Sequence, residues 1–269
     1  MKGQTMTGQT MTGKVVTARR VADISPARLA QLDSGTVEAT TLTECLAVDF
    51  AVLMQAALPD MGQGALAQMD HAAPDGISKR MPLAARLILA RYGPQKLVEL
   101  SQHPSDTLRG WACFMVGAVE GHSLTERLDM IRPLADDSHF GVREWAWMAL
   151  RPHVAADLDT AIALLSSWTS EPSERLRRFA SETTRPRGVW CAHLGALRTA
   201  PSLALPILEP LRADPALYVQ DSVGNWLNDA AKDQPDWVRD LCSGWQQASP
   251  VPATLRICKR AQRSLNRKI

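Results

Sequence analysis

The sequence lacks the features that mark several common classes of protein. It has no apolar run near the roughly 20 residues that a membrane-spanning helix needs. Its five cysteines lie far apart with no CxxC pair, which argues against a zinc ribbon and a disulfide framework. Its six histidines are scattered and form no HExxH motif, so we predict no metal site. Strand signals are nearly absent, because the chain has no Asn-Gly hairpin and no useful alternation of Val, Ile and Tyr.

The composition is that of a globular protein with one unusual feature. Of the 269 residues, 45% are hydrophobic and 22% charged, which excludes wholesale disorder and suits one large domain or two ordinary ones. The net charge of +2 permits a nucleic-acid partner without arguing for one. Eight tryptophans against four phenylalanines and two tyrosines reverse the usual order of aromatic residues.

The first residues differ from the rest of the chain. Residues 1–20 are polar, rich in Gly and Thr, and lack the apolar segment of a secretory signal. We predict a flexible tail there and, with unpaired cysteines, a cytoplasmic protein. We expect N-terminal helices of irregular repeats over residues 21–100, including one long helix over 39–58 and another over 81–92. Regular repeats are expected over residues 101–269.

The remaining chain repeats a two-helix unit. Four helices open on Leu108, Val142, Leu176 and Val219, which are 34, 34 and 43 residues apart, and a weaker fifth copy opens on Leu255, 36 residues further. A shorter amphipathic helix and a turn rich in Asp, Ser, Pro or Glu precede several of them. Units of this length predict an all-α fold, a right-handed HEAT- or armadillo-like solenoid of antiparallel helix pairs that is C-shaped with a concave basic groove.

The repeats align in columns. Counted from each opening residue, the fifth position holds Ala112, Ala146, Ala180 and Val223, and the ninth holds Val116, Leu150, Thr184 and Leu227. With the openers these positions form one apolar stripe that we assign to the core. The second, third, sixth, seventh and tenth positions carry the polar residues, and we expect them to line the concave surface.

Arginines recur on or just after successive second helices. The candidates for binding DNA phosphates are Arg143, Arg151, Arg177, Arg178, Arg185 and Arg187. For any single arginine, pairing with Asp or Glu of the next repeat is the favoured interpretation. For the whole set, a face that binds a polyanion is supported about equally, so both interpretations stay open.

Three tryptophans are candidates for contact with a base or a deoxyribose. Trp147 occupies the sixth position, which points to the groove, and Trp190 follows the densest arginine cluster. Trp145 shares the fourth position with Trp111 and Phe179, where packing is the more frequent role. An indole face attracts a cation by roughly 0.5–2 kcal/mol, which suits a positively charged alkylated base.

Glu144 is the candidate catalytic carboxylate. It lies three residues before Trp147, so the two share a helix face. A carboxylate beside aromatic and arginine side chains can stabilise an oxocarbenium-like sugar or activate water. The alternative is an ion pair between repeats, which for any one carboxylate is the favoured interpretation.

Two segments resemble a known family. Residues 177–190, RRFASETTRPRGVW, resemble the RRLxSEGxRPRLPW pattern of bacterial DNA alkylation repair proteins, and residues 218–235, YVQDSVGNWLNDAAKDQP, resemble the YVRxSVxNxLNDxxKDxP pattern of the same family. The resemblance implies a C-shaped helical solenoid that cradles duplex DNA. It also implies hydrolysis of the N-glycosidic bonds of N3- or N7-alkylated bases without a metal or organic cofactor.

The sequence departs from one branch of that family. In that branch an EFAxRPF segment supplies a glutamate, and Trp147 stands at its place in the matching stretch here, with Glu144 one turn earlier. We therefore carry two hypotheses. The first is a monomeric alkylpurine DNA glycosylase in which Glu144 acts. The second is a non-catalytic HEAT-repeat module that binds damaged or branched DNA or a protein partner. A scaffold without a nucleic-acid role is a third possibility, disfavoured by the arginine face.

Overall fold

Pairs of helices build the described chain, residues 20–265 of the computed structural model, in which every regular element is helical. Residues 1–19 of the predicted tail lie outside this range. The first helices of the pairs are α6 (Lys96–Ser101), α8 (Leu124–Ala135), α10 (Leu158–Ser166), α13 (Leu205–Leu211) and α15 (Pro235–Ala248). The second helices are α7 (Asp106–Ala118), α9 (Phe140–Ala156), α11 (Glu174–Thr183), α14 (Leu217–Ala230) and α16 (Pro252–Ala261). No helix in this range is long and apolar enough to cross a bilayer.

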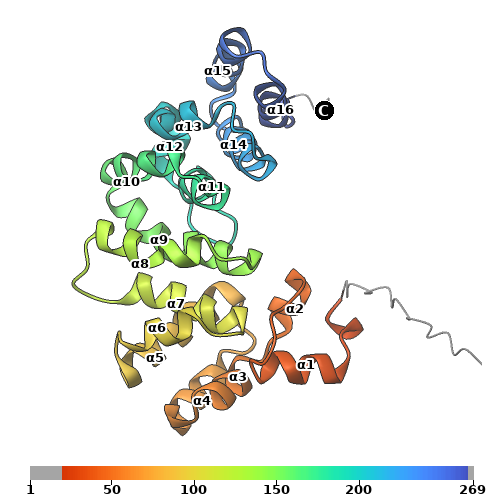
Figure 1. Cartoon of the computed structure of the whole chain (residues 1–269), viewed down its shortest axis with the longest axis vertical. Coiled ribbons are helices and arrows are strands. Elements are labelled where there is room, and N and C mark those ends of the chain that lie inside the picture. Colours follow the sequence, from red (N-terminus) through yellow and green to blue (C-terminus); the bar gives the residue numbers. More distant parts are fainter. Residues whose placement is uncertain (1–19, 266–269) are drawn as a thin grey trace, which may run out of the picture.

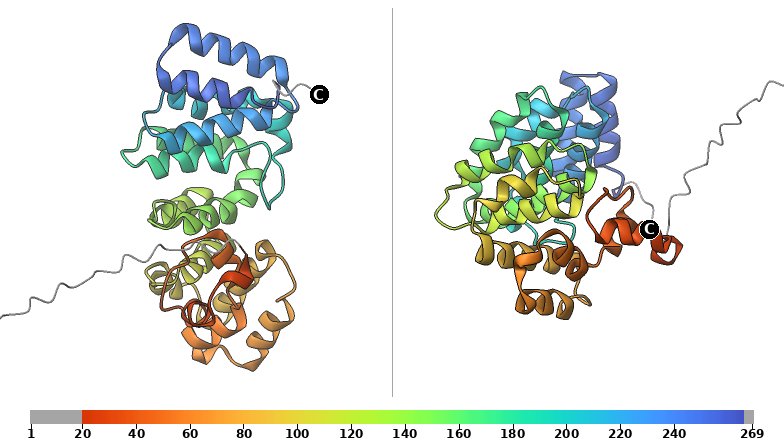
Figure 2. Two further views of the ribbon diagram at one scale, coloured as in Figure 1. Left: turned by 90° about the vertical axis from the view of Figure 1, so that its right-hand side faces the viewer. Right: turned by 60° about the horizontal axis from the view of Figure 1, so that its bottom comes forward.

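The second helices stack on one another in chain order. Contacts run from α5 (Ile77–Tyr92) to α7, and then to α9, α11, α14 and α16. The helices follow an arc whose open side holds α2 (Leu42–Ala47), α14 and α16 (Figure 1). The helices lie in successive layers when the molecule is turned (Figure 2). The predicted all-α, HEAT-like solenoid is therefore confirmed.

The apolar columns form the core. All residues of the predicted first, fifth and ninth columns in the four main repeats are buried, and most of them are fully inaccessible. The fourth column contributes Trp111, Trp145 and Phe179, which are also buried. Small residues in the fifth column bring neighbouring second helices close together. The longer third interval contains an inserted loop, α12 (Gly195–Thr199) and the 3-10 helix η4 (Pro201–Ala204).

The predicted register of the fifth repeat is wrong by one residue. Leu255 is 45% exposed, whereas Thr254, Ile257, Cys258 and Ala261 are buried against the preceding repeat. The repeat therefore opens on Thr254. An apolar leucine was the natural choice for an opener, but a small threonine fills the core position, and the leucine lies on the outside of the helix.

The N-terminal helices depart from the prediction in one place. Residues 39–58 are not one helix, because α2 ends at Ala47 and α3 (Phe50–Ala57) begins three residues later. The Asp49 side chain accepts the backbone N–H groups of Ala51 and Val52 at 2.9 and 3.0 Å and so starts a new helix. Residues 81–92 are helical as predicted, in α5. The other N-terminal elements are η1 (Val21–Asp23), α1 (Pro26–Asp33), η2 (Pro59–Met61) and α4 (Gln63–His71).

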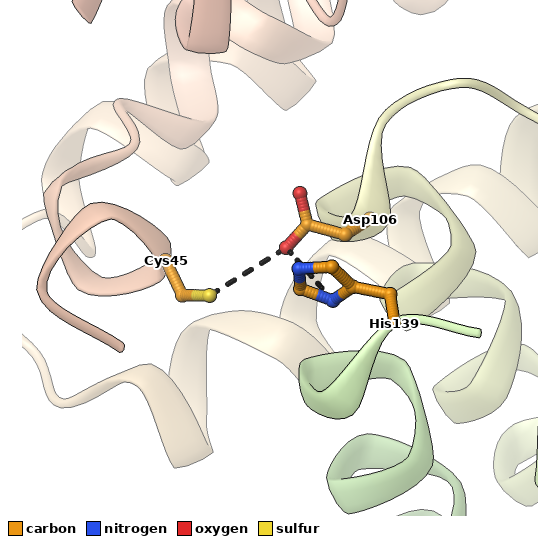
Figure 3. Close-up of side chains that lie close together, drawn as sticks. All are labelled: Cys45, Asp106 and His139. Atoms are coloured by element: carbon orange, nitrogen blue, oxygen red, sulfur yellow. Dashed lines mark hydrogen bonds and ion pairs between the residues drawn. The ribbon is translucent and has the colours of Figure 1, made fainter. Parts of the chain in front are cut away.

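A buried polar cluster ties the N-terminal helices to the repeats. Cys45 of α2 donates its thiol to Asp106 at the start of α7, over 3.6 Å, and His139 before α9 lies 3.7 Å from the same carboxylate oxygen (Figure 3). His139 Nδ1 accepts the Gly141 N–H, so its Nε2 carries the proton and donates to the Ala39 carbonyl at 2.6 Å. Burial, with the nearby carboxylate, raises the pKa of the Cys45 thiol. These contacts join α2, the start of α7 and the turn before α9, which are far apart in the sequence.

Gly110 of α7 allows the closest approach in the stack. A Cβ atom there would lie 2.5 Å from Met81 Cε of α5 and 2.7 Å from Trp145 Cδ1 of α9. We expect Gly110→Ala to lower the free energy of unfolding by about 1–3 kcal/mol, because both neighbours belong to the packed core. Gly64→Ala, in α4 with nothing within 4 Å of the added atom, is the control. It should stabilise by about 0.5–1 kcal/mol. Urea unfolding of both variants tests the prediction, and equal effects would contradict it.

Glu44 makes the N-terminal helices sensitive to acid. Its carboxylate accepts Arg28 Nη2 at 2.8 Å and the Thr40 N–H at 2.7 Å, and the Arg28 contact lowers the pKa of Glu44 from 4.5 to about 2. A lowered folded-state pKa stabilises above the unfolded value, and this contribution is lost as the pH falls through the folded value. Wild type should therefore lose stability between pH about 4.5 and 2 by an amount that Glu44→Gln does not show. Parallel curves of unfolding free energy against pH would rule this out.

Candidate functional site: a cleft on the second helices

In the four main repeats, the side chain at the second position donates hydrogen bonds to the turn before its own helix. In three repeats its Nη1 donates to the carbonyls six and five residues earlier, and in the fourth Gln220 does the same with Nε2. These residues are Arg109 (to His103 and Pro104), Arg143 (to Asp137 and Ser138), Arg177 (to Glu171 and Pro172) and Gln220 (to Asp214 and Pro215). The recurrence confirms the register of the four main repeats. It also explains why the second position is polar. The turn carbonyls need hydrogen-bond donors, and the side chain at this position supplies them.

Two of these arginines also pair with the next repeat. Arg109 Nε lies 2.8 Å from Asp137, and Arg177 Nε lies 2.6 Å from Asp214. The favoured interpretation of a single arginine, pairing between repeats, is thus confirmed for Arg177. Its donors are used inside the protein, which argues against the predicted phosphate contact at this residue.

Arg143 breaks this pattern and contacts Tyr218 instead. Its Nε donates to the Tyr218 hydroxyl at 3.1 Å, and its guanidinium carbon lies 5.2 Å from the ring centroid. The guanidinium of Arg178 lies 4.6 Å from the same ring. Tyr218 therefore contacts two cations, and its ring attracts both of them. It belongs to the second motif quoted above but was not among the predicted site residues.

A cleft of about 520 Å³ opens on the second-helix side of the stack. Helices α9, α11, α14 and α16, the inserted loop and Leu42 of α2 form its walls. The predicted residues that line it are Glu144, Trp147, Arg178, Arg185 and Trp190, and its other charged residues are Glu182, Asp221 and Arg260. Phe140, Met148, Val189 and Tyr218 add apolar surface. An aromatic cleft with a few charged groups has the form of a ligand site.

Glu144 faces this cleft and is held from both sides. Its Oε1 pairs with Arg178 Nη2 at 2.6 Å, and its Oε2 accepts the Trp147 Nε1–H at 2.8 Å. Its side chain remains 35% exposed. The carboxylate is therefore fixed in orientation while it stays accessible from the cleft, which is what electrostatic stabilisation of a developing positive charge requires.

The two cleft tryptophans differ in exposure. Trp147 is 4% exposed, whereas Trp190 is 49% exposed. Trp190 has a φ angle of 61°, in the left-handed region that a bulky residue rarely adopts. Such backbone strain costs about 1–3 kcal/mol and is often found at functional sites. Trp190 is thus the aromatic side chain most available to a ligand.

Trp145 does not line the cleft. It is buried in the second-helix stack, and its ring lies nearly parallel to that of Trp190, with centroids 6.4 Å apart and an interplanar angle of 21°. Its predicted contact with a base is not supported by this position. It backs Trp190 from the core side, and this agrees with the packing role that the fourth position favours.

Arg178 and Arg185 line the cleft within a buried network. Arg178 Nη2 lies 3.5 Å from Glu182, Arg185 Nη1 lies 2.7 Å from Glu182, and Arg185 Nη2 lies 2.6 Å from Asp229. Burial alone would raise the pKa of Glu182, but the charges of the two arginines outweigh it and hold that pKa below its usual range. Both guanidinium charges are balanced by carboxylates, so this part of the cleft has no spare positive charge.

Arg151 and Arg187 hold the loop that carries Trp190. Arg151 is almost fully buried and donates to the backbone carbonyls of Thr183, Arg185 and Ala192 at 2.9, 2.6 and 3.0 Å. Burial lowers its pKa. Arg187 pairs with Asp233 at 2.8 Å, away from the cleft. Neither position supports the predicted phosphate contact, because Arg151 is bonded to the loop backbone and Arg187 is paired with Asp233.

The fold and the cleft define a helical-repeat protein, and part of the chain matches a known family. Residues 141–242 match the model of the DNA alkylation repair enzyme family. The resemblance inferred from the two motifs is thereby confirmed for this segment, which contains Glu144, Trp147 and the Trp190 loop.

Relatives extend the comparison to more of the chain. The uncharacterized protein YhaZ of Bacillus subtilis is 37% identical over 150 residues, which are 56% of this chain and 41% of YhaZ. The alkylpurine DNA glycosylase AlkC of Pseudomonas fluorescens, solved bound to DNA containing an abasic site analogue, is 26% identical with a TM-score of 0.66, over 93% of this chain and 65% of AlkC. AlkD2 of Streptococcus mutans, 22% identical with a TM-score of 0.58 over 75% of this chain and 97% of its own, shows the same fold. The chain thus spans only part of YhaZ and of AlkC.

The Arg151 contacts predict a large effect on stability. Arg151→Gln leaves at least one of the three buried carbonyls without a donor, and we expect the free energy of unfolding to fall by about 3 kcal/mol or more. Residues 185–194 should also become the first site of limited proteolysis. Arg239→Gln on α15, which removes an exposed pair with Asp236, is the control and should change stability by less than about 1 kcal/mol. If the two variants have the same unfolding free energy and the same first cleavage site, Arg151 does not hold the loop.

Proposed function

We propose that the protein binds duplex DNA on its second-helix side and hydrolyses the N-glycosidic bond of cationic, N3- or N7-alkylated bases. The observation that carries this proposal is the Glu144 carboxylate, fixed by Arg178 and Trp147 and accessible from an aromatic cleft. The match of residues 141–242 to the DNA alkylation repair family supports the biological context. The similarity to AlkC, whose structure holds DNA with an abasic site analogue, supports DNA as the partner.

The chemistry needs little from the protein. An alkylated purine carries a positive charge, so the bond between its nitrogen and C1′ of the sugar breaks with the electron pair passing to the base, which leaves as a neutral molecule. Positive charge then develops on the sugar. Glu144 stabilises this charge and orients a water molecule that adds to C1′, and the proton of that water passes to the carboxylate or to solvent. Trp190, which is 49% exposed, offers a π-face that attracts the cationic base before it leaves.

The position of Glu144 bears on the substitution noted in the sequence, where Trp147 replaces the glutamate of one branch of the family. Trp147 occupies the position of the glutamate in one branch of the family, but its indole N–H holds the Glu144 carboxylate at 2.8 Å. Glu144, one turn earlier on α9, thus brings a carboxylate to the side of the cleft where Trp147 lies. This supports Glu144 as the acting group.

One observation favours the alternative, a DNA-binding module without catalysis. The Arg178 guanidinium lies 2.6 Å from Glu144 and neutralises much of its charge, which weakens it as a stabiliser of a sugar cation. In that case the cleft would bind DNA and leave the glycosidic bond intact. The two functions differ in whether free base is released.

Base release under single-turnover conditions tests the proposal. Duplexes containing N3-methyladenine or N7-methylguanine should release free base with wild-type protein, and Glu144→Gln should slow release by about 100-fold or more, since it keeps the shape but removes the charge. Glu174→Gln, at an exposed position on α11, is the matched control and should match wild type.

Two results would contradict the proposal in different ways. Release by Glu144→Gln at the wild-type rate would show that this carboxylate does not act. Absence of release by the wild type from either duplex, combined with retained binding of the same DNA, would establish the binding module in place of the glycosylase.

A further inference from the structure

An arginine row on α16 and the turn that follows it faces a row of acidic and amide side chains on α14. Both rows occupy the third, seventh and tenth positions of their repeats, once the fifth repeat opens on Thr254. Arg256 Nη2 lies 2.6 Å from Asp221 Oδ1, and Arg260 Nε lies 2.9 Å from Asn225 Oδ1. Arg263 Nε continues the row to Asn228 Oδ1 at 3.0 Å. The sequence analysis did not identify this row, and the register placed at Leu255 put Arg263 in the apolar ninth column.

The α16 row differs from the other cleft arginines in charge balance. Arg178 and Arg185 are each paired with two carboxylates, whereas Arg256 and Arg260 share the single carboxylate of Asp221, at 2.6 and 3.1 Å. The remaining described partner of Arg260, Asn225, is neutral. Within residues 20–265, one positive charge of this pair is therefore left without a carboxylate. Arg260 lines the cleft, and Arg256 lies one turn earlier on α16.

The same two arginines are also accessible. Their side chains are 38% and 34% exposed, compared with 11% and 15% for Arg178 and Arg185. Lys259, on the same helix, is exposed as well. Exposed guanidinium groups keep donors for a ligand, and their planar fork matches the oxygens of a phosphate.

Close packing fixes Arg260 at the cleft. A Cβ atom at Gly224 of α14 would lie 2.8 Å from Arg260 Cδ and 2.9 Å from its Cβ, so the arginine stem rests directly on the α14 backbone. The guanidinium then lines the cleft together with Glu144 and Trp190. An arginine held in place loses less side-chain entropy when it binds than a free one would.

We propose that Arg256 and Arg260 bind backbone phosphates of the DNA strand whose base enters the cleft. This inference deepens the proposed function and rests on DNA being the partner. The balanced charges around Glu182 and Asp229 suit an uncharged sugar and a cationic base, whereas the excess charge on α16 suits the anionic backbone. The phosphate contacts therefore come from the last described helix, and not from the arginines at the second position of each repeat.

Salt dependence of binding tests this inference. The probe is a fluorescein-labelled duplex with a tetrahydrofuran abasic-site analogue, titrated at several NaCl concentrations. Each phosphate contact contributes about 0.9 to the slope of log K against log salt concentration. Arg256→Gln/Arg260→Gln should therefore reduce the slope by about 1–2 and weaken binding about tenfold or more at low salt. Arg239→Gln, on the outer helix α15 and 51% exposed, should change neither.

A charge-conserving variant separates charge from folding. Arg256→Lys/Arg260→Lys should keep most of the slope, and circular dichroism melting should show that both double variants fold. A wild-type slope in the folded glutamine variant would overturn the inference, as would an equal loss with Arg239→Gln.

The failure of this inference and that of the proposed function are distinguishable. Suppose that the wild type releases no base and that the glutamine variant shows a smaller slope of log K against log salt concentration. The phosphate contact is then supported, and the proposed glycosylase activity is contradicted. If wild type releases base and the glutamine variant keeps the full slope, the glycosylase stands and the phosphate contact is overturned.

Discussion

The contact between Glu144 and Arg178 joins two neighbouring repeats at the wall of the cleft, and the arrangement of the site depends on it. Arg178 is largely removed from water, which would lower its pKa, but Glu182 and Glu144 outweigh that effect and keep the arginine charged. Tyr218 packs against the guanidinium from the other side. Because Glu144 belongs to α9, Arg178 to α11 and Tyr218 to α14, correct stacking of these three helices is what brings the carboxylate and the aromatic rings together.

Charge is distributed unevenly along the cleft. Around α11, buried arginines and carboxylates cancel, and the cost of removing these charges from water offsets much of their attraction. On α16 the arginines exceed the carboxylates and remain accessible. A modest net charge of +2 therefore conceals a local basic edge, and total charge is a poor guide to a nucleic-acid surface in a protein whose arginines are mostly engaged inside.

The periodic features of the sequence predict the fold well, because the same positions of each second helix are buried in every repeat. The openers and the small fifth-column residues, such as Ala112 and Ala146, identify the core and the register of four repeats. Trp147 and Glu144 were correctly expected to share a face, since their spacing fixes it. The family resemblance added the expectation of duplex DNA as a partner and of glycosylase chemistry, which no spacing in the chain could supply.

Features that depend on distant partners could not be predicted in the same way. Arg151 reads as one more cation on a polar face, and only the inserted loop shows that its donors go to backbone carbonyls. Cys45, Asp106 and His139 meet although they are far apart in the chain, and no motif links them. The register of α16 failed because Thr254, a polar residue, fills a core position that Leu255 fits better by composition.

The structure of the protein bound to duplex DNA with an abasic-site analogue tests the central claim most directly. We expect the abasic sugar to lie against the Glu144 carboxylate beside Trp190, with a neighbouring phosphate on the α16 arginines. DNA bound along the outer helices α8, α10 and α13, with the cleft facing solvent, would contradict it.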